Sequence, residues 1–216
     1  MISPKYVVAV GVISEAGTVS FLGTGFLVGE DKVITARHVI KGYTSGIVIS
    51  PVDFDDYNTY QDTELNLYHC LNVEIVEDDP IKDLCVMKII GNISLLSPLN
   101  LTSADEINVG DEVGVIGYPH CNENRKVVTF QTAKIGAKVL LSSSGIKCKH
   151  LILNLQSRPG QSGSLVFNLK NNYVIGVLIG AYADDSMGTV LVGSINPADL
   201  HQTTYVVSAE YIKDML

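Results

Sequence analysis

Short segments rich in β-branched and aliphatic residues, separated by turns, recur along almost the whole 216-residue chain. Such segments favour β-strands, because branched side chains pack well on a pleated surface. Helical periodicity is found only at the end, where Ser208 is a candidate N-cap for a short helix over 209–216. A helical turn is also expected at 36–40, a turn at 77–80 and a hairpin around 189–192. The expected strands cover residues 6–13, 18–28, 32–35, 46–50, 65–76, 83–90, 112–116, 126–141, 150–155, 173–179 and 203–207.

A polar segment divides these strands into two sets. Residues 93–109 contain Asn, Ser, Pro, Thr and Asp with scattered leucines, a composition typical of a linker. We therefore expect an N-terminal domain over residues 1–92 and a C-terminal domain over 110–216. Many short strands without alternating helices favour two β-barrels or a sandwich over a βαβ arrangement.

The composition excludes several classes of protein. With 46% hydrophobic and 18% charged residues, the chain is not expected to be disordered. A net charge of -8 without a Lys/Arg cluster argues against nucleic-acid binding. We find no signal-peptide pattern and no apolar run of about 18 residues, so we expect neither export nor a membrane span. The four cysteines are then expected to be free thiols in the cytoplasm.

One glycine-flanked serine is a candidate nucleophile. Ser162 lies between Gly160-Gln161 and Gly163, just before the apolar run 165–167. Glycines permit a tight turn that holds a hydroxyl forward and aims successive N–H groups at one point, where they stabilise an oxyanion. The alternative is an ordinary surface turn, because Gly, Pro and Ser dominate turns.

A serine hydroxyl needs a base within hydrogen-bond reach, and that base needs an orienting partner. Among the five histidines, His38 follows an expected strand, where a side chain can face a cleft. Asp83 begins a strongly apolar strand. A carboxylate there is costly unless it meets a charged or hydrogen-bonding group, and an imidazole that becomes protonated would suit it.

The order of these residues, with two further motifs, resembles chymotrypsin-fold serine proteases, and most of all the bacterial trypsin-like and HtrA-like protease domains. The resemblance extends from about Tyr6 to Leu216. The motifs are Gly-Thr-Gly-Phe-Leu-Val (23–28), Val-Ile-Thr-Ala-Arg-His-Val (33–39), Asp-Leu-Cys-Val (83–86), Gly-Tyr-Pro (117–119) and Pro-Gly-Gln-Ser-Gly-Ser (159–164). This resemblance implies an all-β fold of two antiparallel six-stranded barrels with a short C-terminal helix.

The resemblance also implies the role of each site residue. Ser162 would be the nucleophile, His38 the general base and then general acid, and Asp83 the group that fixes the imidazole tautomer. The N–H groups of Gly160 and Ser162 would form the oxyanion hole. Such enzymes cut protein or peptide substrates through an acyl-enzyme and need no metal or organic cofactor, so we expect none.

Gln161 departs from the family pattern. Zymogen-activated relatives have there an Asp that pairs with a freshly cut N-terminus, so we expect no activation of that kind. The order of the oxyanion loop must then come from elsewhere, for example from a partner or from substrate. Two alternatives to a constitutive enzyme therefore remain open: a partner-activated effector protease and a catalytically silent peptide-binding module on the same fold.

The resemblance places the substrate pocket less sharply. Gln156 and Ser157 would lie at its base, Ile179-Gly180-Ala181 along one wall and Thr204 along the other. Because no acid stands at Gln156, a preference for Arg or Lys is not supported. We expect a small or medium uncharged residue on the amino side of the scissile bond.

Two groups of residues are compatible with metal binding, but each has a simpler interpretation. Cys70, Cys121 and Cys148 lie beside or near histidines, but without the Cys-x-x-Cys spacing of zinc sites. Buried free thiols and surface histidines are the simpler interpretation. The acidic segment 53–62 is compatible with calcium, although a solvated loop explains it more simply.

Overall fold

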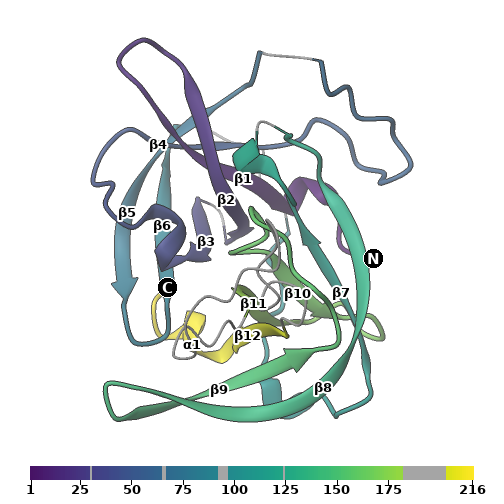
Figure 1. The fold of residues 1–216 in the computed structure, drawn as a ribbon. Helices are drawn as coiled ribbons and strands as arrows, with labels where there is room; N and C mark the ends of the chain where they lie inside the picture. Colours follow the sequence, from purple (N-terminus) through teal and green to yellow (C-terminus); the bar gives the residue numbers. More distant parts are fainter. Residues whose placement is uncertain (30, 65–66, 92–96, 124, 182–202) are drawn as a thin grey trace, which may run out of the picture.

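Two closed antiparallel barrels make up the protein (Figure 1). The structure is a computed structural model that describes residues 1–29, 31–64, 67–91, 97–123, 125–181 and 203–216. Within these residues each barrel has six strands, joined in the order β1-β2-β3-β6-β5-β4 and β10-β11-β12-β9-β8-β7. The prediction of an all-β fold with two six-stranded barrels is confirmed.

The first barrel carries the N-terminal strand set. Its strands are β1 Val7–Ile13, β2 Val19–Val28, β3 Lys32–Ala36, β4 Ile47–Ser50, β5 Leu71–Asp79 and β6 Leu84–Ile90. A 3-10 helix, η1 Pro4–Tyr6, precedes β1, and a second one, η2 Arg37–Ile40, follows β3 where a helical turn is expected. The functional candidates His38 and Asp83 therefore lie where β3 ends and where β6 begins.

The second barrel carries the serine turn, which lies between its third and fourth strands in sequence order. Its strands are β7 Glu112–Gly117, β8 Thr129–Ser143, β9 Ile146–Leu153, β10 Leu165–Asn168, β11 Val174–Ala181 and β12 Thr204–Ser208. The remaining elements are η3 Ala104–Glu106, η4 Cys121–Glu123 and the helix α1 Glu210–Lys213. Figure 1 shows the long β8–β9 hairpin running along the lower edge of the molecule, next to α1.

One hydrophobic cluster joins the two barrels. It combines buried side chains of the first barrel, such as Val7 and Phe26, with Ile116, Leu165 and Phe167 of the second. Two further clusters fill the interiors of the single barrels. Removal of this apolar surface from water stabilises both barrels at once, so their relative position is fixed by the core itself.

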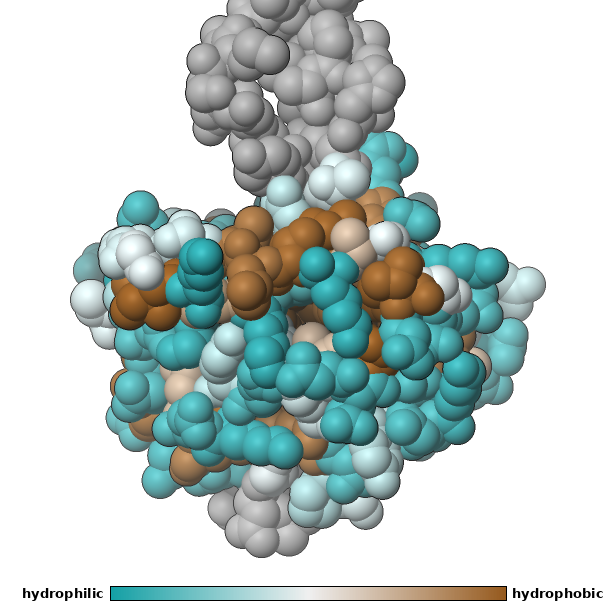
Figure 2. Space-filling model, turned by 90° about the horizontal axis from the view of Figure 1, so that it is seen from below, coloured by the Kyte–Doolittle hydropathy of each residue, from teal (hydrophilic) through white to brown (hydrophobic). Residues whose placement is uncertain are grey.

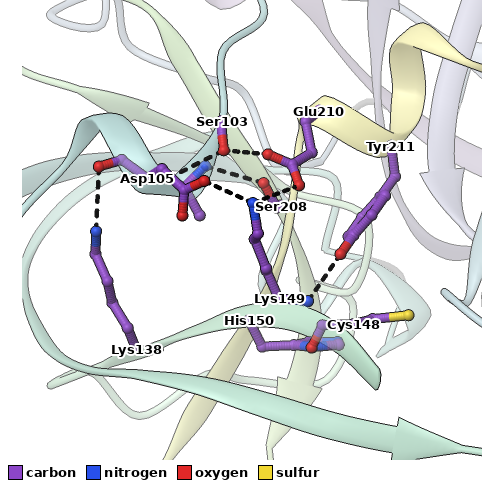
Figure 3. Close-up of polar contacts among 10 residues, drawn as sticks. Ser103, Asp105, Lys138, Cys148, Lys149, His150, Ser208, Glu210 and Tyr211 are labelled. Atoms are coloured by element: carbon purple, nitrogen blue, oxygen red, sulfur yellow. Dashed lines mark hydrogen bonds and ion pairs between the residues drawn. The ribbon is translucent and has the colours of Figure 1, made fainter. Parts of the chain in front are cut away.

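A polar clasp fastens the connecting segment to the end of the second barrel (Figure 3). Lys149 of β9 lies 2.6 Å from a carboxylate oxygen of Asp105 and 3.1 Å from one of Glu210. Ser103 donates a hydrogen bond to the same Glu210, and the Lys149 N–H donates to the Tyr211 hydroxyl. The connection between the barrels is thereby held against β9 and α1.

Several boundaries differ from the sequence-based expectation. The strand expected at 65–76 begins only at Leu71 and continues to Asp79 as β5, because a register shift between Ile75 and Glu77 carries the pairing past the expected turn. Ser208 does not cap α1, because it is the last residue of β12 and its hydroxyl accepts a hydrogen bond from the Ala104 N–H. The N-cap position of α1 is occupied by Ala209. The hairpin expected around 189–192 lies outside the described residues.

The surface of the second barrel is not uniformly polar. Figure 2, which views the molecule from below, shows an apolar band across an otherwise largely hydrophilic face. Leu140 and Ile146 of the β8–β9 hairpin are among the large exposed apolar side chains. Among the described residues there is no helix with the length and apolar character that crossing a membrane requires.

Candidate active site

His38 and Asp83 meet because their strands are neighbours. β3 pairs with β6 so that Ala36 lies opposite Leu84, which places the residues following β3 beside the residue preceding β6. The Arg37 N–H donates to the Asp83 carbonyl at 2.9 Å and holds the two segments together. Asp83 adopts φ 55°, a left-handed conformation that Asp tolerates better than most residues.

Both carboxylate oxygens of Asp83 are used on His38. Oδ2 lies 2.6 Å from His38 Nδ1, and Oδ1 accepts the His38 main-chain N–H at 2.9 Å. A carboxylate is an acceptor only, so this contact assigns the proton to Nδ1 and leaves Nε2 as the basic nitrogen. The two side chains are 43% and 30% exposed, so the pair lies open to a bound molecule.

Ser162 lies in a turn that two positive-φ glycines shape. Gly160 has φ 89° and Gly163 has φ 88°. A β-carbon on Gly163 would lie 1.9 Å from the Thr24 carbonyl oxygen, so only glycine fits there. The turn is therefore pressed directly against β2 of the first barrel.

The same close packing brings Ser162 next to the histidine segment. Gly23 of β2 lies between them: a β-carbon there would be 2.8 Å from Val39 and 3.0 Å from the Ser162 carbonyl oxygen. The Ser162 hydroxyl donates to the Ile179 carbonyl of β11 at 2.8 Å. Within the described part of the chain, no hydrogen bond joins this hydroxyl to His38. The structure thus pairs His38 with Asp83 directly and holds Ser162 in the turn that packs against β2.

Two main-chain N–H groups of the serine turn have no hydrogen-bond acceptor among the described residues. Neither the Gly160 N–H nor the Ser162 N–H has an acceptor among the described residues, whereas the Gln161 and Gly163 N–H groups bond to Arg158 and Leu178. The Pro159 carbonyl accepts the His120 N–H at 2.6 Å. In a trans peptide the N–H points opposite to the carbonyl, so the Gly160 N–H points away from His120 and is free to donate.

The residues expected to form the substrate pocket lie on connected segments. The Ser157 N–H donates to the Thr204 hydroxyl at 3.0 Å, and that hydroxyl donates to the Leu155 carbonyl at 2.6 Å. On the neighbouring strand Ala181 pairs with Thr204, and Gly180 pairs with Tyr205. Gln156 also has an interaction within the protein. Ser157, Thr204 and the backbone of β11 are therefore brought together next to Ser162.

The cysteines near this site are structural. Burial raises the pKa of the Cys121 thiol, which lies beneath the serine turn, to about 12, and burial also raises the pKa of Cys85 to about 12. Both remain protonated at neutral pH and so do not compete as nucleophiles. All four cysteines are free. Across the described residues no three His, Cys, Asp or Glu side chains are grouped so that they could hold a metal ion.

Thr24 is a residue of the site that the sequence did not single out by itself. Its side chain is fully buried; its hydroxyl donates to the Gly160 carbonyl and accepts the Tyr118 N–H. Its own N–H donates to the Ser162 carbonyl at 2.9 Å. The sequence signal for Thr24 was its place in the Gly-Thr-Gly motif. Such a motif indicates that another segment of backbone comes close, but it does not identify that segment.

Comparison with known proteins identifies relatives of this fold. Residues 23–177 match the model of the trypsin-like peptidase domain. The fold is similar to the MamO protease domain from Magnetospirillum magneticum, with a TM-score of 0.71, 16% identity and coverage of 99% of this chain and 97% of that one. It is also similar to the Rv3671c protease from M. tuberculosis in its active form, with a TM-score of 0.69, 21% identity and coverage of 98% and 79%.

A match of this extent defines the family. The chain belongs to the trypsin-like peptidase family. The identities to the solved structures are low, so these structures show the shared double-barrel fold alone.

Proposed function

We propose that this protein is a serine endopeptidase whose triad is Ser162, His38 and Asp83. The observation that carries the proposal is the doubly hydrogen-bonded contact between Asp83 and His38, which orients an exposed imidazole with a basic Nε2. The trypsin-like peptidase match supports a protein or peptide substrate. The unpaired N–H groups of Gly160 and Ser162 supply what an acyl transfer needs beside that base.

In the proposed reaction, Ser162 Oγ attacks the scissile carbonyl carbon while His38 Nε2 takes the hydroxyl proton. Asp83 stabilises the imidazolium that forms, and the N–H groups of Gly160 and Ser162 bind the carbonyl oxygen as it becomes negative. His38 then gives its proton to the leaving amine, which leaves an acyl-enzyme. Water, activated by the same imidazole, hydrolyses the ester and restores the hydroxyl of Ser162.

Before attack the Ser162 side chain must turn from Ile179 toward His38. This motion exchanges one neutral hydrogen bond, which contributes about 1 kcal/mol, for another, and rotamer changes of accessible side chains are fast. The observed bond to Ile179 is therefore a resting position of the hydroxyl.

The pocket segments support a small or medium uncharged side chain in the substrate. The Thr204 hydroxyl accepts the Ser157 main-chain N–H and donates to the Leu155 carbonyl, and no carboxylate stands at position 156 to attract a cation. We propose this preference for the residue before the scissile bond.

The Ser162–Ile179 bond also favours a second candidate, a module that binds peptides without cutting them. Digestion of a complex peptide library, followed by mass spectrometry, separates the two. We expect cleavage by the wild type, none by Ser162→Ala, and retained cleavage by the matched control Ser164→Ala. The Ser164 hydroxyl is buried and has no hydrogen-bond partner among the described residues, so its loss should be tolerated. Peptide binding by the wild type without new termini would favour the silent module.

A further inference from the structure

Gln161, next to the candidate nucleophile, is completely buried, yet both ends of its side-chain amide are satisfied. Its Oε1 accepts the Arg158 N–H at 2.7 Å, and its Nε2 donates to Oε1 of Gln131 at 2.7 Å. Burying a side-chain amide without hydrogen-bond partners costs free energy. The folded protein therefore strongly favours the loop conformation in which both hydrogen bonds form.

The contact with Arg158 closes the loop that carries the oxyanion donor. The Gln161 main-chain N–H donates to the Arg158 carbonyl at 3.0 Å, while its side chain accepts the Arg158 N–H. These reciprocal bonds enclose Pro159 and Gly160. They fix the peptide whose N–H is left unpaired, so the direction of that donor depends on Gln161.

The contact with Gln131 ties this loop to the barrel. Gln131 lies on β8, paired with Val115 of β7, and so belongs to the rigid sheet. On the opposite side, Thr24 holds the Gly160 and Ser162 carbonyls from the first barrel. The serine turn is therefore held from both barrels by uncharged groups.

We propose that Gln161 is a positioning residue that keeps the oxyanion hole formed through a neutral latch, defined as the hydrogen bonds Gln161–Gln131 and Gln161–Arg158. The proposal rests on the proposed protease function for its catalytic consequence. Because the latch contains no titratable group, the hole stays formed without a buried ion pair and without a newly cut N-terminus.

Gln131 is the better position for a test, because it is only half-buried and does not adjoin the nucleophile. Gln131→Met keeps the size of the side chain but removes the acceptor for Gln161. Gln131→Glu keeps an acceptor oxygen and is the conservative rescue. The matched control is Gln61→Met, which removes a glutamine that also makes two hydrogen bonds, both to Val128.

We expect Gln131→Met to lower kcat about tenfold to hundredfold with little change in KM, because the hole acts on the transition state. Gln131→Glu should stay near the wild type, and Gln61→Met should lower Tm without lowering kcat. An unchanged kcat in Gln131→Met, or an equal loss in Gln131→Glu, would overturn the latch.

A second readout is independent of turnover. The amide signal of Gly160 in ¹⁵N-labelled protein should move in Gln131→Met and remain in place in Gln131→Glu and Gln61→Met. If the wild type proves unable to cleave peptides, the protease function fails, while this signal still decides the latch. A Gly160 signal that is the same in Gln131→Met as in the wild type rejects it.

Discussion

At the scale of single residues, Asp83 combines a structural and a chemical task. Its left-handed backbone places the carboxylate so that one oxygen holds the His38 main chain and the other holds the ring. In Asn one of these two acceptor oxygens is replaced by an NH2 group, which is a donor and cannot accept the N–H group that the oxygen held. The side chain at position 83 therefore decides which tautomer His38 adopts.

We predict that Asp83→Asn lowers kcat by about four orders of magnitude, as loss of the correct tautomer does in enzymes of this mechanism. The matched control is Asp78→Asn, an acid on β5 that lies 2.6 Å from the Arg37 guanidinium beside His38. The control should change kcat little. Peptide hydrolysis measured for both variants checks this, and near-equal rates for the two would show that Asp83 does not orient the base.

Position 163 is a second position at which the structure permits only one type of residue, and that residue is glycine. We predict that Gly163→Ala costs about 3 kcal/mol of folding stability or more, because it adds a clash with the Thr24 carbonyl to a positive φ. Gly17→Ala has a similar φ of 79° in open space and should cost about 1 kcal/mol. Urea unfolding of both variants measures the difference, and equal losses would contradict the tight contact between the serine turn and β2.

At the scale of elements, the turn between β5 and β6 delivers Asp83. Asp79 closes this turn: its carboxylate accepts the N–H groups of Ile81 and Lys82 and pairs with the Lys82 ammonium at 2.5 Å. Burial alone would raise the pKa of Asp79, but these hydrogen bonds and the ammonium outweigh it and lower the pKa. The folded state therefore favours the charged carboxylate.

This lowered pKa has a defined consequence for stability. The stabilisation from Asp79 is fully present above the ordinary aspartate value of 3.8 and is lost as the pH falls below it toward the folded-state pKa. We predict a smaller fall in Tm between neutral pH and about pH 3 for Asp79→Asn than for the wild type. Glu15→Gln, at the exposed β1–β2 turn, should keep the wild-type dependence. The same fall in Tm for the wild type and Asp79→Asn would exclude the role of this turn.

Most elements could be predicted from the sequence because strand periodicity is a local property. The exceptions depend on distant partners. β5 passes the expected turn because β6 continues to pair with it, and Ser208 serves the linker at Ala104 rather than α1. Such competition between local and distant partners is decided by tertiary structure.

At the scale of the whole molecule, the barrels share one core cluster and the hydrogen bonds of Thr24 and Tyr118. The Tyr118 hydroxyl donates across the interface to the Val7 carbonyl at 3.3 Å. Neither barrel can lose its structure without exposing part of the other. Both barrels contribute residues of the candidate site, so this site exists only in the assembled pair.

We therefore predict that the two barrels unfold in a single transition. Hydrogen exchange at increasing urea should give the same free energy of opening for amides of β2 and of β10, since both strands contribute to the shared cluster. A barrel that loses protection at a lower urea concentration than the other would contradict this coupling.

The candidate site could be predicted only in part, for the same reason. His38, Asp83, Gly160 and Ser162 lie in local motifs that the sequence displays directly. Two acceptors come from other strands and have no local signal in the sequence. They are the Ile179 carbonyl, which accepts a hydrogen bond from the Ser162 hydroxyl, and the Gln131 side chain, which accepts one from the Gln161 side chain. Their contribution follows from strand order and register, which the sequence alone left open.

The most direct test of the proposed function is the intact mass of the protein after reaction with a fluorophosphonate, which forms a covalent adduct with an activated serine. We predict one adduct on the wild type, located at Ser162 by peptide mapping, and none on Ser162→Ala. Ser164→Ala should be labelled like the wild type. A wild type that forms no adduct, or Ser162→Ala that is still labelled, would contradict the assignment of Ser162 as the nucleophile.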